Sequence, residues 1–144
     1  MNYDITIRNH IKYSIGIAVL MILLSCGNEN VDCNVKGTFT FTNETDYKLE
    51  TGKGIIDPNG LLTVTQEDIG TCDITESEYI SPLFDSPTII VNDSFCKTYI
   101  STSASIGDGP LGIANFTSKK VDNNNYEFYY TFTTSEFENL KKCN

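Results

Sequence analysis

The groups that could carry catalysis are carboxylates, because the sequence offers few others. Its single histidine is His10, so the Ser-His-Asp and Cys-His arrangements of nucleophilic catalysis cannot form in the later part of the chain. A glycosidase-like pair of carboxylates is conceivable in the acidic stretch 66–82. The candidates there are Asp68, Asp73, Glu76 and Glu78. Acidic side chains in an acidic protein are more often simply solvated, so we predict that the protein is not an enzyme.

Cysteines are the other reactive side chains, and four of the five form an even set: Cys33, Cys72, Cys96 and Cys143. An even set in a small exported domain is expected to form two disulfides. Zinc sites need cysteines two to four residues apart, which these are not, and the acidic stretch lacks the spacing of a calcium loop. We therefore expect neither a metal nor another cofactor. Three pairings are possible; we favour Cys33 with Cys143 and Cys72 with Cys96.

An uncharged apolar segment, 15–24, follows Arg8 and Lys12 near the N-terminus. Ten helical residues rise about 15 Å, which is half of the ~30 Å hydrocarbon core of a membrane. The segment is therefore typical of a signal peptide rather than of a permanent membrane span.

This segment ends in Leu23-Leu24-Ser25-Cys26 and resembles the lipobox of bacterial lipoproteins. That pattern has leucine at −3, a small residue at −1 and an obligatory cysteine at +1; Leu24 departs from it at −2, which is usually small. The resemblance implies a lipid anchor on Cys26, namely a thioether-linked diacylglycerol and a palmitate-like chain on the new amino group. Such an anchor is sufficient for stable membrane attachment. A plain secretory peptide or an uncleaved anchor is the alternative.

We accordingly divide the chain into a lipoprotein signal peptide (1–25), an acidic tether (26–34) and a β-sandwich domain (35–144). The tether has little to bury and is expected to be disordered, either as a bland spacer or as a weak surface-export signal. The expected location is the cell envelope, in the outer membrane, with the domain periplasmic or surface-exposed.

The net charge limits the classes of partner that the protein can bind. The chain has 10 basic and 19 acidic residues; without 1–25 it keeps 8 and 18, a net charge of −10. This charge argues against nucleic acid and against adsorption to anionic lipid headgroups, and it suits basic partners.

Alternation of apolar and polar residues predicts strands at 35–42, 47–50, 88–91, 95–102, 113–121 and 126–133, and at Leu62 and Val64. Turn residues at 43–46 suggest a hairpin between the first two strands. Loops are expected at 66–82 and 103–112. The last strand should bury one face, made up of Tyr126, Phe128, Tyr130 and Phe132.

The C-terminal sequence Ser135-Glu136-Phe137-Glu138 fits a capping box, which predicts a short helix over 136–142. The resulting fold class is mainly β: an antiparallel β-sandwich, with an immunoglobulin-like fold or an open barrel as variants, and a short C-terminal helix. The combination of a lipobox and a β-rich domain resembles small uncharacterised bacterial lipoproteins.

Function is less constrained than fold. We favour a membrane-anchored envelope lipoprotein whose non-catalytic domain binds a protein or a glycan. The candidate binding face is Tyr129, Thr131 and Thr133, on the outward side of the last strand, with the loops 66–82 and 103–112 as other possible surfaces. The alternatives are an immunity or inhibitor lipoprotein acting on a basic partner, and a small carboxylate-dependent hydrolase.

Overall fold

The computed structural model describes residues 32–103 and 106–143. The lipobox, Cys26 and the first part of the tether therefore lie outside the described residues. No helix in the described ranges is long and apolar enough to cross a membrane.

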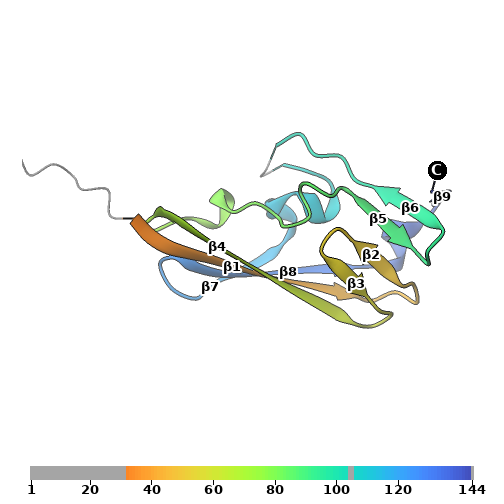
Figure 1. The fold of residues 1–144 in the computed structure, drawn as a ribbon, viewed down its shortest axis with the longest axis horizontal. Helices are drawn as coiled ribbons and strands as arrows, with labels where there is room; N and C mark the ends of the chain where they lie inside the picture. The colour runs from red at the N-terminus through yellow and green to blue at the C-terminus, as the bar shows by residue number, and fades with distance from the viewer. Residues whose placement is uncertain (1–31, 104–105, 144) are drawn as a thin grey trace, which may run out of the picture. The chain divides into compact units, whose positions relative to one another are not determined.

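The first of two sheets is four-stranded, with the order β4-β1-β8-β7. Its strands are β1 (Asp32–Asn43), β4 (Leu61–Thr71), β7 (Thr117–Lys120) and β8 (Asn125–Phe132). β1 pairs antiparallel with β4 and parallel with β8, while β7 and β8 are antiparallel. Figure 1 shows β1 and β4 as the long ribbons of this sheet.

The second sheet is five-stranded, with the order β3-β2-β5-β6-β9, and all its neighbours are antiparallel. Its strands are β2 (Leu49–Thr51), β3 (Gly54–Ile56), β5 (Thr88–Val91), β6 (Phe95–Thr98) and β9 (Lys141–Lys142).

Short 3₁₀ turns make up the helical content of the described residues. They are η1 (Glu76–Glu78), η2 (Gly109–Leu111), η3 (Ile113–Asn115) and η4 (Thr134–Phe137).

Both sheets contribute to one hydrophobic core. Phe39 of β1 stacks on Phe128 of β8 with ring centroids 4.7 Å apart, and Leu49 and Val91 of the other sheet are buried in the same cluster. The prediction of a mainly β fold is confirmed. The buried face predicted for the last strand is confirmed as well, since Tyr126, Phe128, Tyr130 and Phe132 are all buried.

The hairpin predicted across 43–46 is wrong, because β1 and β2 belong to different sheets. Asn43 is fully buried at this crossover. Its side-chain amide donates to the carbonyl oxygens of Tyr47, Ile56 and Asp57 at 2.7, 3.2 and 3.0 Å. Its Oδ1 accepts from both the main-chain N–H and the hydroxyl of Thr45. These bonds satisfy a polar turn inside the core and send the chain from one sheet to the other.

The helix predicted over 136–142 is also wrong. The capping box is present two residues earlier, with Thr133 as N-cap and Glu136 as its partner, and it opens the single turn η4. Asn139 then has φ of 60°, a left-handed conformation that stops a helix. The chain continues into β9, which pairs with β6.

Other element boundaries in the structure differ from the predicted ones, because strands distant in sequence pair with each other. β4 continues through Thr71, so the first part of the expected loop 66–82 is strand held by β1, and β1 itself begins at Asp32 within the expected tether. β6 ends at Thr98, and the expected strand 113–121 is η3 followed by β7. The parallel pairing of β1 with β8 makes the first sheet mixed rather than antiparallel.

All four cysteines of the domain are in disulfides, as predicted, but the favoured pairing is wrong. The bridges are Cys33–Cys72 and Cys96–Cys143, with Cα–Cα distances of 5.2 and 5.1 Å. The antiparallel register of β1 and β4 places Cys33 opposite Gly70, next to the end of β4. Each bridge therefore joins neighbouring segments of one sheet.

Candidate functional site

The outward face of the four-stranded sheet presents hydroxyl side chains from every strand. Alternation along a strand sends every second side chain to the same face. The residues of β1 on this face are half-buried, and those of the other strands are exposed or nearly so. We call this surface the threonine face; its threonines are Thr38, Thr40, Thr42, Thr63, Thr65, Thr71, Thr117 and Thr131.

Tyr129 occupies an inner position on the threonine face. It lies opposite Thr40 of β1 on one side and Thr117 of β7 on the other, and its side chain is 42% exposed. Thr131 is exposed and lies opposite Thr42. Both residues point outward, as the sequence predicts.

Thr133, the third residue of the predicted binding face, has a different role. It lies beyond the end of β8, where it is the N-cap of η4 and its hydroxyl is 3.0 Å from that of Ser135. Its main-chain N–H donates to Glu136. The structure therefore separates Thr133 from Tyr129 and Thr131.

A charged group fixes the Tyr129 hydroxyl. Tyr129 donates to Glu127 Oε2 at 2.7 Å, and Lys119 Nζ lies 3.3 Å from the same oxygen. The hydrogen bond from Tyr129, helped by Lys119, lowers the pKa of Glu127. The bond to Glu127 in turn raises the pKa of Tyr129. Tyr129 thus presents a neutral, oriented ring and hydroxyl, which suits recognition better than proton transfer.

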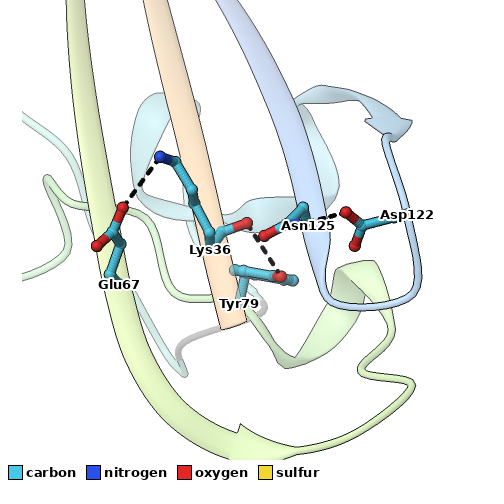
Figure 2. A network of polar contacts seen from close by, with 5 residues as sticks. All are labelled: Lys36, Glu67, Tyr79, Asp122 and Asn125. Atoms are coloured by element: carbon cyan, nitrogen blue, oxygen red, sulfur yellow. Dashed lines mark hydrogen bonds and ion pairs between the residues drawn. The ribbon is translucent and has the colours of Figure 1, made fainter. Parts of the chain in front are cut away.

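A second polar network lies at the start of β1 (Figure 2). Lys36 Nζ forms an ion pair with Glu67 at 3.0 Å. On the other side of the strand, the Tyr79 hydroxyl donates to the carbonyl oxygens of Lys36 and Asn124 at 3.3 and 2.9 Å. Burial raises the pKa of Tyr79. Gly37 makes room for the Tyr79 ring, because a Cβ there would lie 2.9 Å from it.

The carboxylates considered for hydrolysis are distributed around this end of the sheet. Asp68 and Glu78 line a cleft of about 570 Å³, together with Val35 and Tyr79. Glu78 accepts from the N–H and the hydroxyl of Thr75, both at 2.7 Å, which lowers its pKa. A general acid needs the opposite shift.

The other two hydrolysis candidates have structural partners. Glu76 accepts a hydrogen bond from Ser118 of β7. Asp73 adopts a left-handed turn, with φ of 61°, and its N–H donates to the side chain of Asn124. These contacts join the segment after β4 to the β7–β8 end of the sheet.

Sequence reasoning missed a carboxylate that two tyrosines share. Glu136 Oε2 accepts from Tyr130 at 2.6 Å and from Tyr99 at 3.1 Å, beside a cleft of about 590 Å³. Burial, reinforced by Glu136, raises the pKa of both tyrosines. Gly109, with φ of 51°, passes so close to Tyr99 that a Cβ would overlap the ring. From the sequence, only the position of Tyr130 on a buried face could be predicted.

No protein-family model, curated protein or solved structure matches this chain. Within residues 32–103 and 106–143, no group of three or more histidine, cysteine or acidic side chains could hold a metal ion.

Proposed function

We propose that the protein is a membrane-anchored lipoprotein of the cell envelope whose β domain binds a protein or a glycan without catalysis. The observation that carries this proposal is the threonine face, where an oriented, partly exposed Tyr129 lies among hydroxyl groups from four paired strands. Tyrosine combines a large apolar surface with a polar tip, and it is enriched at binding surfaces for that reason.

Anchoring through Cys26 is part of the proposal and has support from the sequence alone. The short apolar segment and its Leu-Leu-Ser-Cys ending fit a lipoprotein signal. The expected location is the outer membrane, with the domain on its periplasmic or external side.

The chemistry of the threonine face favours neutral partners. Thr40, Thr117 and Thr131 offer hydroxyl donors and acceptors, and the one acidic group beside Tyr129 is already paired with Lys119. Hydroxyl-rich glycans and the polar main chain of a protein segment fit such a surface. Nucleic acid does not, because the chain without residues 1–25 has a net charge of −10.

The test compares two substitutions of exposed threonines in the full-length protein held in detergent or nanodiscs. Thr131→Lys alters the threonine face, and Thr98→Lys alters an exposed threonine of β6 in the other sheet. Binding to an envelope glycan panel and to envelope proteins is measured for both. The proposal expects loss for Thr131→Lys alone; equal binding by both variants, or equal loss, contradicts it.

A second candidate is an immunity or inhibitor lipoprotein acting on a basic partner. The observation that favours it is the acidic charge, part of which lines the cleft of Asp68 and Glu78. A basic partner captured by the full-length protein should dissociate as salt rises, and Asp68→Asn should weaken capture while Thr131→Lys should not.

A further inference from the structure

The four edges of the two sheets are protected very differently. β3 and β9 are three and two residues long, and β7 is four residues long. β7 and β9 also carry two lysines each. Short strands and lysines are the usual devices that keep sheet edges from pairing with other chains.

β4 has neither of these two devices, although it carries the charged residues Glu67 and Asp68. It is 11 residues long, with the sequence LLTVTQEDIGT, and so contains neither lysine nor proline. Its register with β1 runs from Thr71 to Leu61 without a bulge. Among the described residues no strand pairs with its other side.

Main-chain hydrogen bonds show which groups of β4 face that open side. The N–H of Lys36 donates to Asn124, just before β8, and the N–H of Asn43 donates to Gly60, just before β4. Odd-numbered residues of β1 therefore bond toward β4, and their partners are the even-numbered residues of β4. The odd-numbered residues of β4 direct their N–H and C=O groups outward.

The Ile69 main chain agrees with this assignment: its N–H is bonded by the Asp68 carboxylate at 2.8 Å rather than by β1, and Asp68 must release it before Ile69 can pair with another strand. The outward set is Leu61, Thr63, Thr65, Glu67, Ile69 and Thr71, and all six side chains are exposed. Leu61 and Ile69 are apolar yet 66% and 68% exposed.

We propose that two copies of this chain join through antiparallel pairing of β4 with β4, around a two-fold axis at Thr65. This register places Thr65 opposite its own copy and Thr63 opposite Glu67. It also places each exposed Leu61 opposite an Ile69, so that both apolar side chains gain a partner on the same face.

The charges along β4 itself are compatible with a second copy. Glu67 is the only charged residue of the outward set, and Lys36 already neutralises it at 3.0 Å. On the inner face the same register places Asp68 opposite Leu62 and Gln66 opposite Val64. No acidic side chain faces another across the axis, so the sequence of β4 is compatible with itself.

The result is one continuous sheet made from two four-stranded sheets. Because the outward set belongs to the threonine face, pairing also joins the two threonine faces. The inference does not depend on what that face binds.

Cysteine cross-linking of the full-length protein in detergent tests the register. Residues directly opposite in a hydrogen-bonded antiparallel pair have Cα atoms about 5.5 Å apart, within disulfide range. Thr65→Cys should therefore give a covalent dimer under mild oxidation. Thr63→Cys is the matched control. In this register residue 63 of one copy lies four residues, or about 13 Å, along the strand from residue 63 of the other copy, so this variant should not cross-link. Peptide mapping verifies that Cys33–Cys72 and Cys96–Cys143 stay intact in both variants.

Sedimentation of the same protein in detergent tests the contact itself. Thr65→Pro removes an N–H that faces outward and so leaves the β1 pairing intact. Because of the two-fold axis, the dimer loses two hydrogen bonds, one from each copy. Each lost bond weakens the association constant roughly two- to tenfold, so dimerisation should weaken on the order of tenfold or more. Thr65→Val, which keeps the N–H, should associate like the wild type.

The proposal is wrong if the wild-type protein stays monomeric at a concentration of about 100 µM. It is also wrong if Thr63→Cys and Thr65→Cys cross-link equally. A dimer that Thr65→Pro leaves unchanged would contradict it as well. A monomeric protein that binds a basic peptide, with binding lost in Thr65→Pro and kept in Thr65→Val, would also overturn it, because β4 would then pair with a different partner.

Discussion

The Tyr130 hydroxyl donates to Glu136 at 2.6 Å, across the boundary between the last long strand and the turn that follows it. Tyr99 donates to the same carboxylate oxygen from a segment 37 residues away in sequence. One acidic side chain thus joins three parts of the chain: the segment after β6, strand β8 and the turn η4.

This arrangement predicts alkaline sensitivity. Burial and Glu136 raise the pKa of Tyr99 and Tyr130 above the usual value of 10. In the unfolded chain both tyrosines lose their protons above about pH 10, while the folded protein retains them. These two tyrosines therefore leave the free energy of unfolding unchanged below about pH 10 and lower it above that pH, by about 1.4 kcal/mol per pH unit for each tyrosine.

Denaturant unfolding between pH 8 and 12 measures this slope. Tyr99→Phe removes one titrating group and should reduce the slope by about 1.4 kcal/mol per pH unit. Tyr129→Phe is the comparison variant: the bond to Glu127 also raises the pKa of Tyr129, but this tyrosine is partly exposed, so its removal should change the slope less. A slope that Tyr99→Phe leaves unaltered would contradict the prediction.

Asn43 should be among the least replaceable polar residues of the domain. Asn43→Ala removes the donors to Tyr47, Ile56 and Asp57 and leaves buried carbonyl groups without that partner. The expected loss is about 3 kcal/mol or more, measured by denaturant unfolding. Asn123→Ala, in an exposed turn, should stay within about 0.5 kcal/mol. Similar losses in both variants would show that the crossover network is not stabilising.

The two faces of β8 should differ in the same measurement. Phe128 is buried and stacks on Phe39, so Phe128→Ala should cost about 3–5 kcal/mol through lost contacts and a cavity. Tyr129→Ala should cost about 1 kcal/mol or less, because the ring is partly exposed. Equal losses would mean that both faces of the strand are covered, which would leave no free surface at Tyr129.

Lipidation of Cys26 has its own test. If the lipobox resemblance holds, Cys26→Ser should accumulate as an unprocessed precursor, since processing requires the lipidated cysteine. Mass spectrometry of the wild-type protein should find acyl chains on residue 26. Mature protein with an unmodified Cys26 would rule out the anchor.

The sequence predicted those features of the fold that depend on a single strand. Alternation in β8 reveals its buried face because a single side of the strand meets the core. Relations between distant segments left no such record: the parallel pairing of β1 with β8, and the register that brings Cys33 to Cys72, depend on partners that periodicity does not identify. The turn at Asn43 illustrates the limit, since asparagine and threonine suit a hairpin and a buried crossover equally well.

The same limit applied to the candidate site: features of one strand could be predicted, and contacts between strands could not. The outward direction of Tyr129 and Thr131 could be predicted from the period of two. The pairing of Tyr129 with Glu127 and Lys119 required the register of β7 on β8. Thr133 was misassigned because the alternation continues one residue beyond the strand, where the chain has already begun η4.

The positions of the two disulfides also determine how the domain would respond to mechanical force along its chain. Tension entering at Asp32 and leaving at Cys143 passes through the Cys33–Cys72 bridge, then along residues 72–96, then through the Cys96–Cys143 bridge. Apart from Asp32 at the start of β1, the four strands of the first sheet lie inside the two loops that this covalent path bypasses. While both bridges stay intact, only the 24 residue steps between Cys72 and Cys96 can be drawn out, to a length of at most about 86 Å at 3.3–3.6 Å per residue, so tension along the chain does not pull out the segments that carry the threonine face.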